Sequence, residues 1–219
     1  MGRLSDQFHF AVTMIRNGVR DGATAPGERL VANDIALALK LSPTPVRQAL
    51  ALLSGAGLLE ARPGVGYFAR ALGVEDLEDL YGASQLLLVA GAKLGLSRRA
   101  VTPLTPAPGL SDPAALAQRA EEVLRALMQE GASPVLMETF AMISDRLAIA
   151  RQAEPYIIDD AANELEQLAA AIGQAQAPHL ALRYFDRRRR MARPIIQQIR
   201  RAVAARPALN DPGGSGRSG

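Results

Sequence analysis

The chain has 219 residues, of which 48% are hydrophobic, with no cysteine, no tryptophan and a formal net charge of +3. The lack of cysteine excludes disulfides and thiolate metal sites, and no hydrophobic run approaches the roughly 20 residues needed to span a membrane. Polar residues at Arg3, Asp6 and His9 replace the apolar core of a secretory signal, so we expect a cytoplasmic protein without membrane contact. Because the apolar residues are mainly Ala and Leu, we expect a mostly helical fold.

The positive charge is unevenly distributed along the chain. Residues 1–72 contain eight Arg or Lys and five Asp or Glu, whereas residues 73–219 contain seventeen of each. The surplus therefore lies in the first third, which is where a nucleic-acid footprint would have to be.

Three helices are predicted at the start of the chain. Apolar residues at helical spacing indicate helices over residues 5–21, 34–39 and 45–56. Either Ser42 or Thr44 can cap the third helix, and Pro45 would suit its first position because a proline there loses no hydrogen bond. The apolar face of this helix would consist of Val46, Ala49, Leu50 and Leu53.

A β-hairpin is predicted next, because two short extended runs, residues 58–61 and 67–70, flank a Pro/Gly turn. Three helices followed by a hairpin is the order of a winged helix-turn-helix. We therefore expect residues 1–72 to form a winged helix-turn-helix DNA-binding domain.

The rest of the chain is expected to be an α-helical bundle over residues 73–205 that binds an effector and dimerises. The predicted helices span residues 75–96, 113–129, 134–153, 155–175 and 178–205, with a proline-rich connection at 102–113. Residues 206–219 are rich in Pro, Gly and Ser and are expected to be a disordered tail.

Short polar and basic side chains at the start of the third helix suit the major groove of DNA. Ser42, Thr44 and Arg47 supply them, and an Arg there can fork to guanine or bind phosphate. Two structural alternatives stay open: Arg47 can be an ordinary solvated residue, and Ser42 and Thr44 can be helix caps only.

Other predicted DNA contacts flank this helix. Arg29 and Asn33 precede the second helix, where polar groups typically hold phosphate, and Arg62 and the turn Gly64, Val65 and Gly66 are narrow enough to approach a minor groove. The glycines can also serve the turn alone.

The sequence resembles the N-terminal domain of GntR-family transcription regulators, and continues into the helical domain of their FadR/FCD branch. The segments that carry this resemblance are residues 26–30, 34–36, 42–50, 57–59, 62–68 and 74–81. The resemblance implies a homodimer that binds a palindromic double-stranded operator and responds to a small ligand in the bundle.

Two residues depart from the pattern of similar proteins, which often carry a cation at each place. Pro43 stands where an Arg is frequent, and Val65 occupies the tip of the wing. We therefore expect Arg47 to carry a larger share of specific binding.

The resemblance also implies a metal held by an Asp and three His, but this chain has only His9 and His179. The corresponding positions hold Leu124, Leu165 and Arg188, and Ser84 replaces a habitual Arg. No metal or other cofactor is therefore expected, and the effector should be uncharged or apolar, or absent.

Four consecutive arginines, residues 187–190, cover every face of a helix, so at least one must turn toward the bundle or a dimer partner. A solvated face is the default reading. Contact with acidic residues of a neighbouring helix, or with an anion in the pocket, remains open. The polar residues proposed to line a ligand pocket are Arg146, Asn163, Arg183 and Arg187.

An enzyme is not supported, because no phosphate loop, dinucleotide fingerprint or Ser/His/Asp signature is present. The alternative to a DNA-binding regulator is a winged helix used for protein–protein interaction and dimerisation, without an effector.

Overall fold

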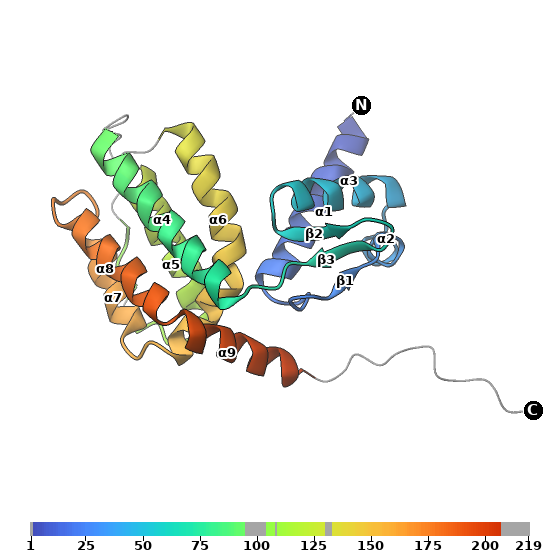
Figure 1. Ribbon diagram of the computed structural model, residues 1–219. Coiled ribbons are helices and arrows are strands. Elements are labelled where there is room, and N and C mark those ends of the chain that lie inside the picture. Colours follow the sequence, from blue (N-terminus) through green and yellow to red (C-terminus); the bar gives the residue numbers. More distant parts are fainter. Residues whose placement is uncertain (1, 95–103, 108, 130–132, 207–219) are drawn as a thin grey trace, which may run out of the picture.

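The computed structural model describes residues 2–94, 104–107, 109–129 and 133–206. The fold is mostly helical with one small sheet, as the composition predicts. Figure 1 shows two lobes joined by the segment that leaves β3 and enters α4.

The first lobe is a winged helix-turn-helix, which confirms the predicted fold. Its helices are α1 (Gly2–Arg20), α2 (Ala32–Leu39) and α3 (Pro43–Gly55), and its strands are β1 (Arg29–Leu30), β2 (Leu59–Arg62) and β3 (Gly66–Ala69). The strands are antiparallel in the order β1-β3-β2, with Phe68 opposite both Arg29 and Glu60.

A separate hydrophobic cluster holds this lobe together. Helix α1 contributes Ala11, Val12 and Ile15 and packs across α3. The predicted apolar face of α3 is fully buried: Val46, Ala49 and Leu50 have no exposed surface, and Leu53 has 1%. Burial of this face leaves the opposite face of α3 free for another partner.

Two helix starts differ from the sequence-based prediction. Helix α3 begins at Pro43, with Ser42 in extended conformation as its N-cap, so Thr44 lies inside the first turn and is not the cap. The reason is that Pro43 also loses no hydrogen bond at the first helical position. Helix α2 begins two residues early at Ala32, and Lys40 ends it in the left-handed region at φ 56°.

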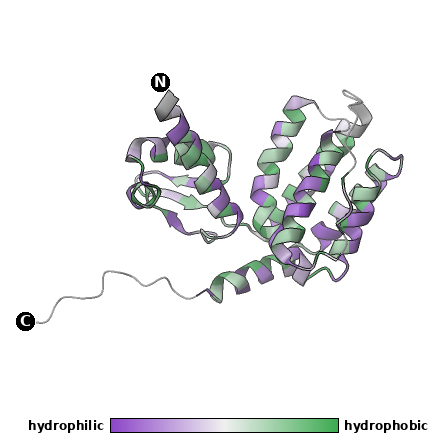
Figure 2. Ribbon diagram, turned by 180° about the vertical axis from the view of Figure 1, so that it is seen from behind, coloured by the Kyte–Doolittle hydropathy of each residue, from purple (hydrophilic) through white to green (hydrophobic). Residues whose placement is uncertain are grey.

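The second lobe is a helical bundle. Its elements are α4 (Val74–Leu94), α5 (Pro113–Gln129), α6 (Pro134–Ala153), the short 3₁₀ helix η1 (Glu154–Tyr156), α7 (Ala161–Ala170), α8 (Ala177–Arg190) and α9 (Ala192–Ala204). Helix α4 contacts α6, α8 and α9, while α5 contacts α6 and α7. Figure 2 shows hydrophobic and hydrophilic residues alternating along these helices, as expected when one face of each helix is buried.

Two predicted bundle helices are wrong. The helix expected over residues 155–175 is η1 followed, after a turn at Asp159 and Asp160, by the shorter α7. The helix expected over 178–205 breaks at Met191 into α8 and α9. The break follows from Pro194, whose ring clashes with the carbonyl four residues earlier and which cannot donate a hydrogen bond. Most of the expected tail, from residue 207, lies outside the described residues.

The two lobes meet where the end of α1 lies against α6. Arg20 pairs with Asp145 of α6 and Glu121 of α5, and Gln152 of α6 donates to the carbonyl of Arg20 at 3.1 Å. Arg16 adds a second ion pair with Asp145 at 3.3 Å. A shift of α6 would therefore be felt directly by the winged helix. In the described part of the chain, no helix is long and apolar enough to cross a membrane.

Candidate nucleic-acid interface

The exposed side of α3 carries the side chains predicted to read DNA. Ser42, Thr44 and Arg47 are all exposed, on the side of the helix opposite its buried face. Although Ser42 occupies the N-cap position, its side chain makes no capping hydrogen bond. The hydroxyl of Ser42 is therefore available to a partner outside the helix.

Helices α2 and α3 are linked through two of the predicted DNA-contacting residues. Nη2 of Arg47 donates to Oδ1 of Asn33 at 3.4 Å, and both residues are exposed. The bond is long and solvated, so it contributes little to stability. It nevertheless orients the guanidinium across the turn between the two helices, with its other donors free.

The wing is a tight turn held by Arg29. The N–H of Val65 donates to the carbonyl of Arg62 at 2.9 Å, with Pro63 and Gly64 between them and Gly64 at φ 72°, as in a type II turn. Nη2 of Arg29 donates to the carbonyl of Val65 at 2.7 Å. Arg29 is thus placed against the wing, where it fixes the conformation of the wing tip.

Arg62 is held at the base of the wing. Its guanidinium lies 4.0 Å from the ring centroid of Phe68 and pairs with Glu60 at 2.9 Å. The hydrogen bond from Arg62 lowers the pKa of Glu60, and the same bond raises the pKa of Arg62. Arg62 is exposed and charged, but it shares its donors with a carboxylate.

These groups gather at one end of the first lobe. The topology brings the start of α3, helix α2 and the β2–β3 turn to the end that faces away from the bundle, as Figure 1 shows. The structure therefore presents the predicted residues together on an outward-facing surface. Their contact with DNA stays a prediction.

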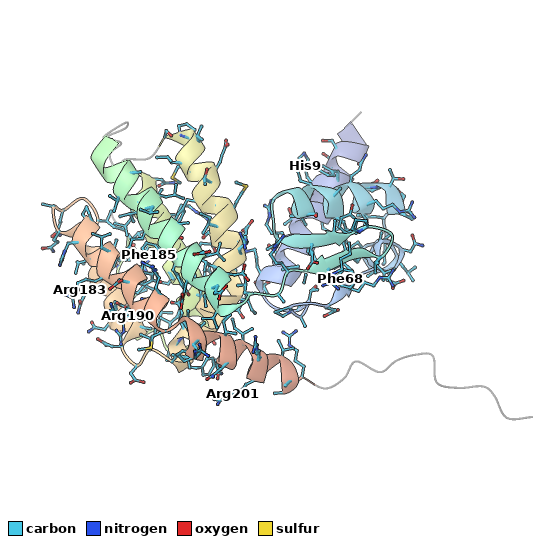
Figure 3. The ribbon with its side chains drawn as sticks, in the orientation of Figure 1. His9, Phe68, Arg183, Phe185, Arg190 and Arg201 are labelled. Atoms are coloured by element: carbon cyan, nitrogen blue, oxygen red, sulfur yellow. The ribbon has the colours of Figure 1, made fainter. Side chains whose placement is uncertain are left out.

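The four residues expected to line a ligand pocket in the bundle are not brought together. Asn163 is exposed and bonds to Asp160, and Arg183 is exposed on the outer side of α8, as Figure 3 shows. Arg187 is partly exposed and lies 3.9 Å from Glu164, while Arg146 faces the first lobe. Asn163 and Arg183 fail as pocket residues because each lies on the solvent side of its helix.

The polar centre of the bundle is built on Arg188, which has 1% of its surface exposed. Its Nε donates to Glu154 at 2.6 Å, and its Nη1 donates to Glu164 at 2.8 Å. The hydroxyl of Tyr81, in α4, donates to the other oxygen of Glu154 at 2.6 Å. One buried network thus connects α4, η1, α7 and α8. Of the two readings left open for the arginine run, Arg188 follows contact with acidic residues of neighbouring elements.

The ionisation of this network is set by burial and pairing. Burial alone would lower the pKa of Arg188, but Glu154 raises it above its ordinary value, with help from Tyr184 and Glu164. Burial and the charge of Glu154 raise the pKa of Tyr81. The guanidinium of Arg188 also lies 3.2 Å from the ring centroid of Tyr184. The network is therefore a fixed ion pair at neutral pH.

The metal implied by the resemblance does not fit these residues. Leu124 and Leu165 are buried apolar side chains, and Arg188 is itself a cation, so none can ligate a metal ion. Within the residues that the structure describes, no group of three or more His, Cys, Asp or Glu is placed to hold a metal.

A second buried arginine was not singled out from the sequence. Arg151 is 3% exposed and donates from Nη1 to the carbonyl and hydroxyl of Ser144, at 3.1 and 2.8 Å, while its Nη2 has no partner in the described part of the chain. It borders a cavity of about 10 Å³ that Tyr184 also lines, large enough for about one water molecule. A buried cation without a carboxylate does not favour the expected uncharged ligand. The spacing of Phe140, Ser144, Leu147 and Arg151 on one face of α6 was the available signal.

Comparison with known proteins agrees with this geometry. Residues 9–68 match the family described as bacterial regulatory proteins, gntR family. An uncharacterized HTH-type transcriptional regulator from the TAR-I ttuE-ttuC' intergenic region of Agrobacterium vitis is 32% identical over 133 residues, which is 61% of this chain and 71% of that protein. The Nta operon transcriptional regulator of Aminobacter aminovorans is 38% identical over 73 residues, 33% of this chain and 35% of that protein.

Solved structures share the fold. E. coli McbR/YncC superimposes with a TM-score of 0.60 at 19% identity, over 88% of this chain and 97% of that one. A GntR transcriptional regulator from Rhodococcus sp. RHA1 gives 0.61 at 19% identity, over 92% of this chain and all of the other. At these identities the likeness establishes the fold alone.

Proposed function

Because this chain belongs to the GntR family of bacterial regulatory proteins and is a DNA-binding transcription regulator, we propose that it acts as a homodimer on a palindromic operator. A two-fold dimer presents two recognition helices to successive major grooves, which makes the operator palindromic. Family membership favours this role over a winged helix used only for protein contacts.

The DNA-binding domain in this proposal is residues 1–72, with α3 in the major groove. Ser42 and Thr44 would approach base edges or phosphates, and Arg47 would fork to a guanine. The observation that carries the proposal is the exposure of these three side chains on a helix whose other face is fully buried. Pro43 and Val65 add no charge, so Arg47 is the main base-reading residue.

The flanking residues position this helix. Asn33, at the start of α2, would hold a backbone phosphate, and Arg62 and the turn from Gly64 to Gly66 would approach the minor groove. The bond from Arg29 to the wing carbonyl supports a positioning role for Arg29, because it orders the wing before DNA is met.

We assign residues 73–205 to dimerisation and to the response to a small ligand. The support is mechanical: α6 is bonded to the end of α1 through Asp145 and Gln152, so a ligand that moves α6 would change the angle of the winged helix. The unpaired Nη2 of Arg151, in α6, favours a ligand with an acceptor or negative charge over an apolar one.

Replacement of Arg47 by alanine tests the proposal. The bound sequence is first selected from random duplexes with the wild-type protein, and affinity is then compared by gel shift at fixed salt. Loss of a bidentate arginine–guanine contact costs about 1–3 kcal/mol, or roughly a 5- to 150-fold loss of affinity. Arg201→Ala, which removes the same charge from an exposed position in α9, is the matched control and should leave affinity unchanged. Unchanged binding by Arg47→Ala, with an unchanged melting temperature, would contradict the assignment.

A further inference from the structure

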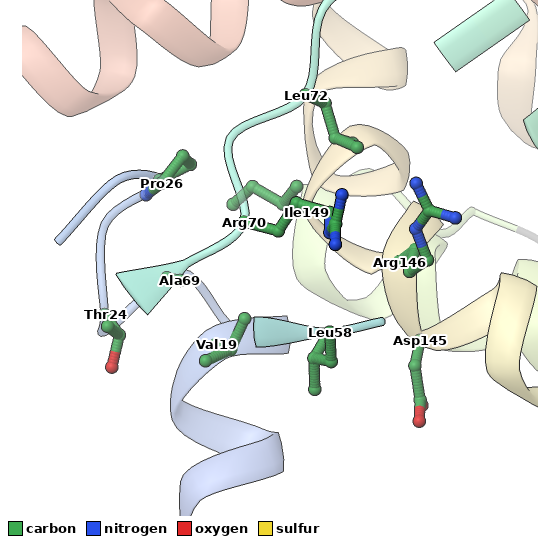
Figure 4. A pocket seen from close by; sticks show the side chains of 10 residues that line it. All are labelled: Val19, Thr24, Pro26, Leu58, Ala69, Arg70, Leu72, Asp145, Arg146 and Ile149. Carbon is green, nitrogen blue, oxygen red and sulfur yellow. The ribbon is translucent and has the colours of Figure 1, made fainter. Parts of the chain in front are cut away.

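A small pocket lies between the winged helix and the bundle. Its walls come from the end of α1, from the segments around Leu58 and Ala69, and from α6, with Arg70 and Arg146 on opposite sides. Figure 4 shows the guanidinium groups of these two arginines facing the same gap, while Asp145 points the other way. The free volume is about 20 Å³, enough for about one water-sized group.

The two arginines lack anionic partners. In the part of the chain that the structure describes, neither forms an ion pair, and Nε of Arg146 is buried without a hydrogen-bond partner. Burial and the charge of Arg70 lower the pKa of Arg146, and only Asp76 acts in the opposite sense. The pocket therefore combines two repelling cations with several free N–H donors.

The rest of the interface between the lobes is built in the opposite way. Arg20 is matched by two carboxylates, and Arg16 shares one of them. The neighbouring residues Asp145 and Arg146 of α6 thus face the first lobe with one attractive and one repulsive contact. An anion at the second contact would convert the repulsion into a bridge, because each guanidinium donates to oxyanions in a forked geometry.

We propose that the gap between Arg70 and Arg146 is a binding site for a small oxyanion, of the phosphate or carboxylate class, that joins the DNA-binding lobe to the bundle. The free volume admits the anionic head alone, so the body of a larger ligand would remain outside. This site lies between the lobes and not inside the bundle, and anion binding there does not require DNA. Its occupation would fix the angle between α6 and the winged helix.

A double-mutant cycle tests the site on the full chain. The melting temperatures of wild type, Arg70→Gln, Arg146→Gln and the double variant are measured without DNA, in chloride and in sodium phosphate of equal ionic strength. In chloride the two arginines should be coupled unfavourably, so each single variant should melt at or above the wild-type temperature. In millimolar phosphate the wild type should gain several degrees, each single variant should lose most of this gain, and the coupling should change sign.

Controls separate this site from the surface proposed for DNA, which also attracts phosphate. Arg47→Ala should keep the full phosphate response, as should Arg190→Gln, an exposed arginine of α8. Malonate and glycerol phosphate are run in parallel to distinguish a carboxylate, free phosphate and the phosphate of a larger molecule. A response in any one anion that depends on both Arg70 and Arg146 supports the site. No response in all three, as expected for a water molecule in the gap, or an equal response in all variants, overturns it. Operator binding by the wild type is measured separately, so failure of either proposal is recognised independently.

Discussion

Replacement of Arg188 by methionine should destabilise the bundle more than loss of any exposed arginine. The guanidinium is almost fully buried and holds Glu154 at 2.6 Å and Glu164 at 2.8 Å. Methionine fills much of the same space but leaves the carboxylate of Glu154, itself 3% exposed, without its cation. The cost is therefore mainly that of an uncompensated buried charge.

The size of this effect follows from the burial of both partners. Breaking a buried ion pair from one side costs about 3–5 kcal/mol. For a chain of this length each kcal/mol lowers the melting temperature by about 2–4 °C, so the expected loss is about 6–20 °C. Differential scanning calorimetry can assign this loss to the bundle transition if the two lobes unfold separately.

Two further variants test the reasoning. Arg190→Met removes an arginine whose side chain is 66% exposed and should change stability by less than about 0.5 kcal/mol. The double variant Arg188→Met with Glu154→Gln should recover part of the loss, because the stranded charge is gone. If Arg188→Met melts with Arg190→Met, or if the double variant is worse than the single variant by the full cost of a second broken contact, the ion-pair argument is refuted.

Two other changes have clear expected outcomes. Val65→Arg places a cation at the wing tip and should tighten operator binding, with the slope of log affinity against log salt steeper by about 0.9 for each phosphate gained; fluorescence anisotropy over a salt series would detect an unchanged slope, which counts against wing contact. The hydrogen bond from Arg119 lowers the pKa of Glu166, so this carboxylate stabilises the folded state above its ordinary pKa of 4.5, and the stabilisation is lost as pH falls through the lower folded value. The melting temperature of Glu166→Gln should therefore be below wild type at pH 7 and approach it in acid; a difference that persists in acid would exclude this cause.

Much of the fold follows from local signals in the sequence. Helices α5 and α6 begin at Pro113 and Pro134 and end where the helical pattern ends, and their bounds agree with those predicted. The apolar spacing of α3 identified its buried face correctly. Local patterns failed at Pro194, since a proline near the start of a new helix and a proline that breaks a long one look alike in sequence.

The polar interior could be predicted only in part. Arg188 continues the stripe formed by Ala177, Ala181, Tyr184 and Phe185, which is a signal that one of the four arginines points inward. Its partners Glu154 and Glu164 come from other elements, and helical spacing carries no information about contacts between helices. For the same reason, the gap between Arg70 and Arg146 depends on how two lobes meet and could not be foreseen.

Selection of bound sequences from a random duplex pool, with the wild-type homodimer state checked by light scattering, tests the central claim most directly. A DNA-reading dimer with α3 in successive major grooves should enrich a palindrome whose half-site centres lie about 10 base pairs, or a multiple, apart. Arg47→Ala should lose enrichment at one defined position of each half-site. Recovery of no common sequence, or of a sequence without two-fold symmetry, would contradict the account.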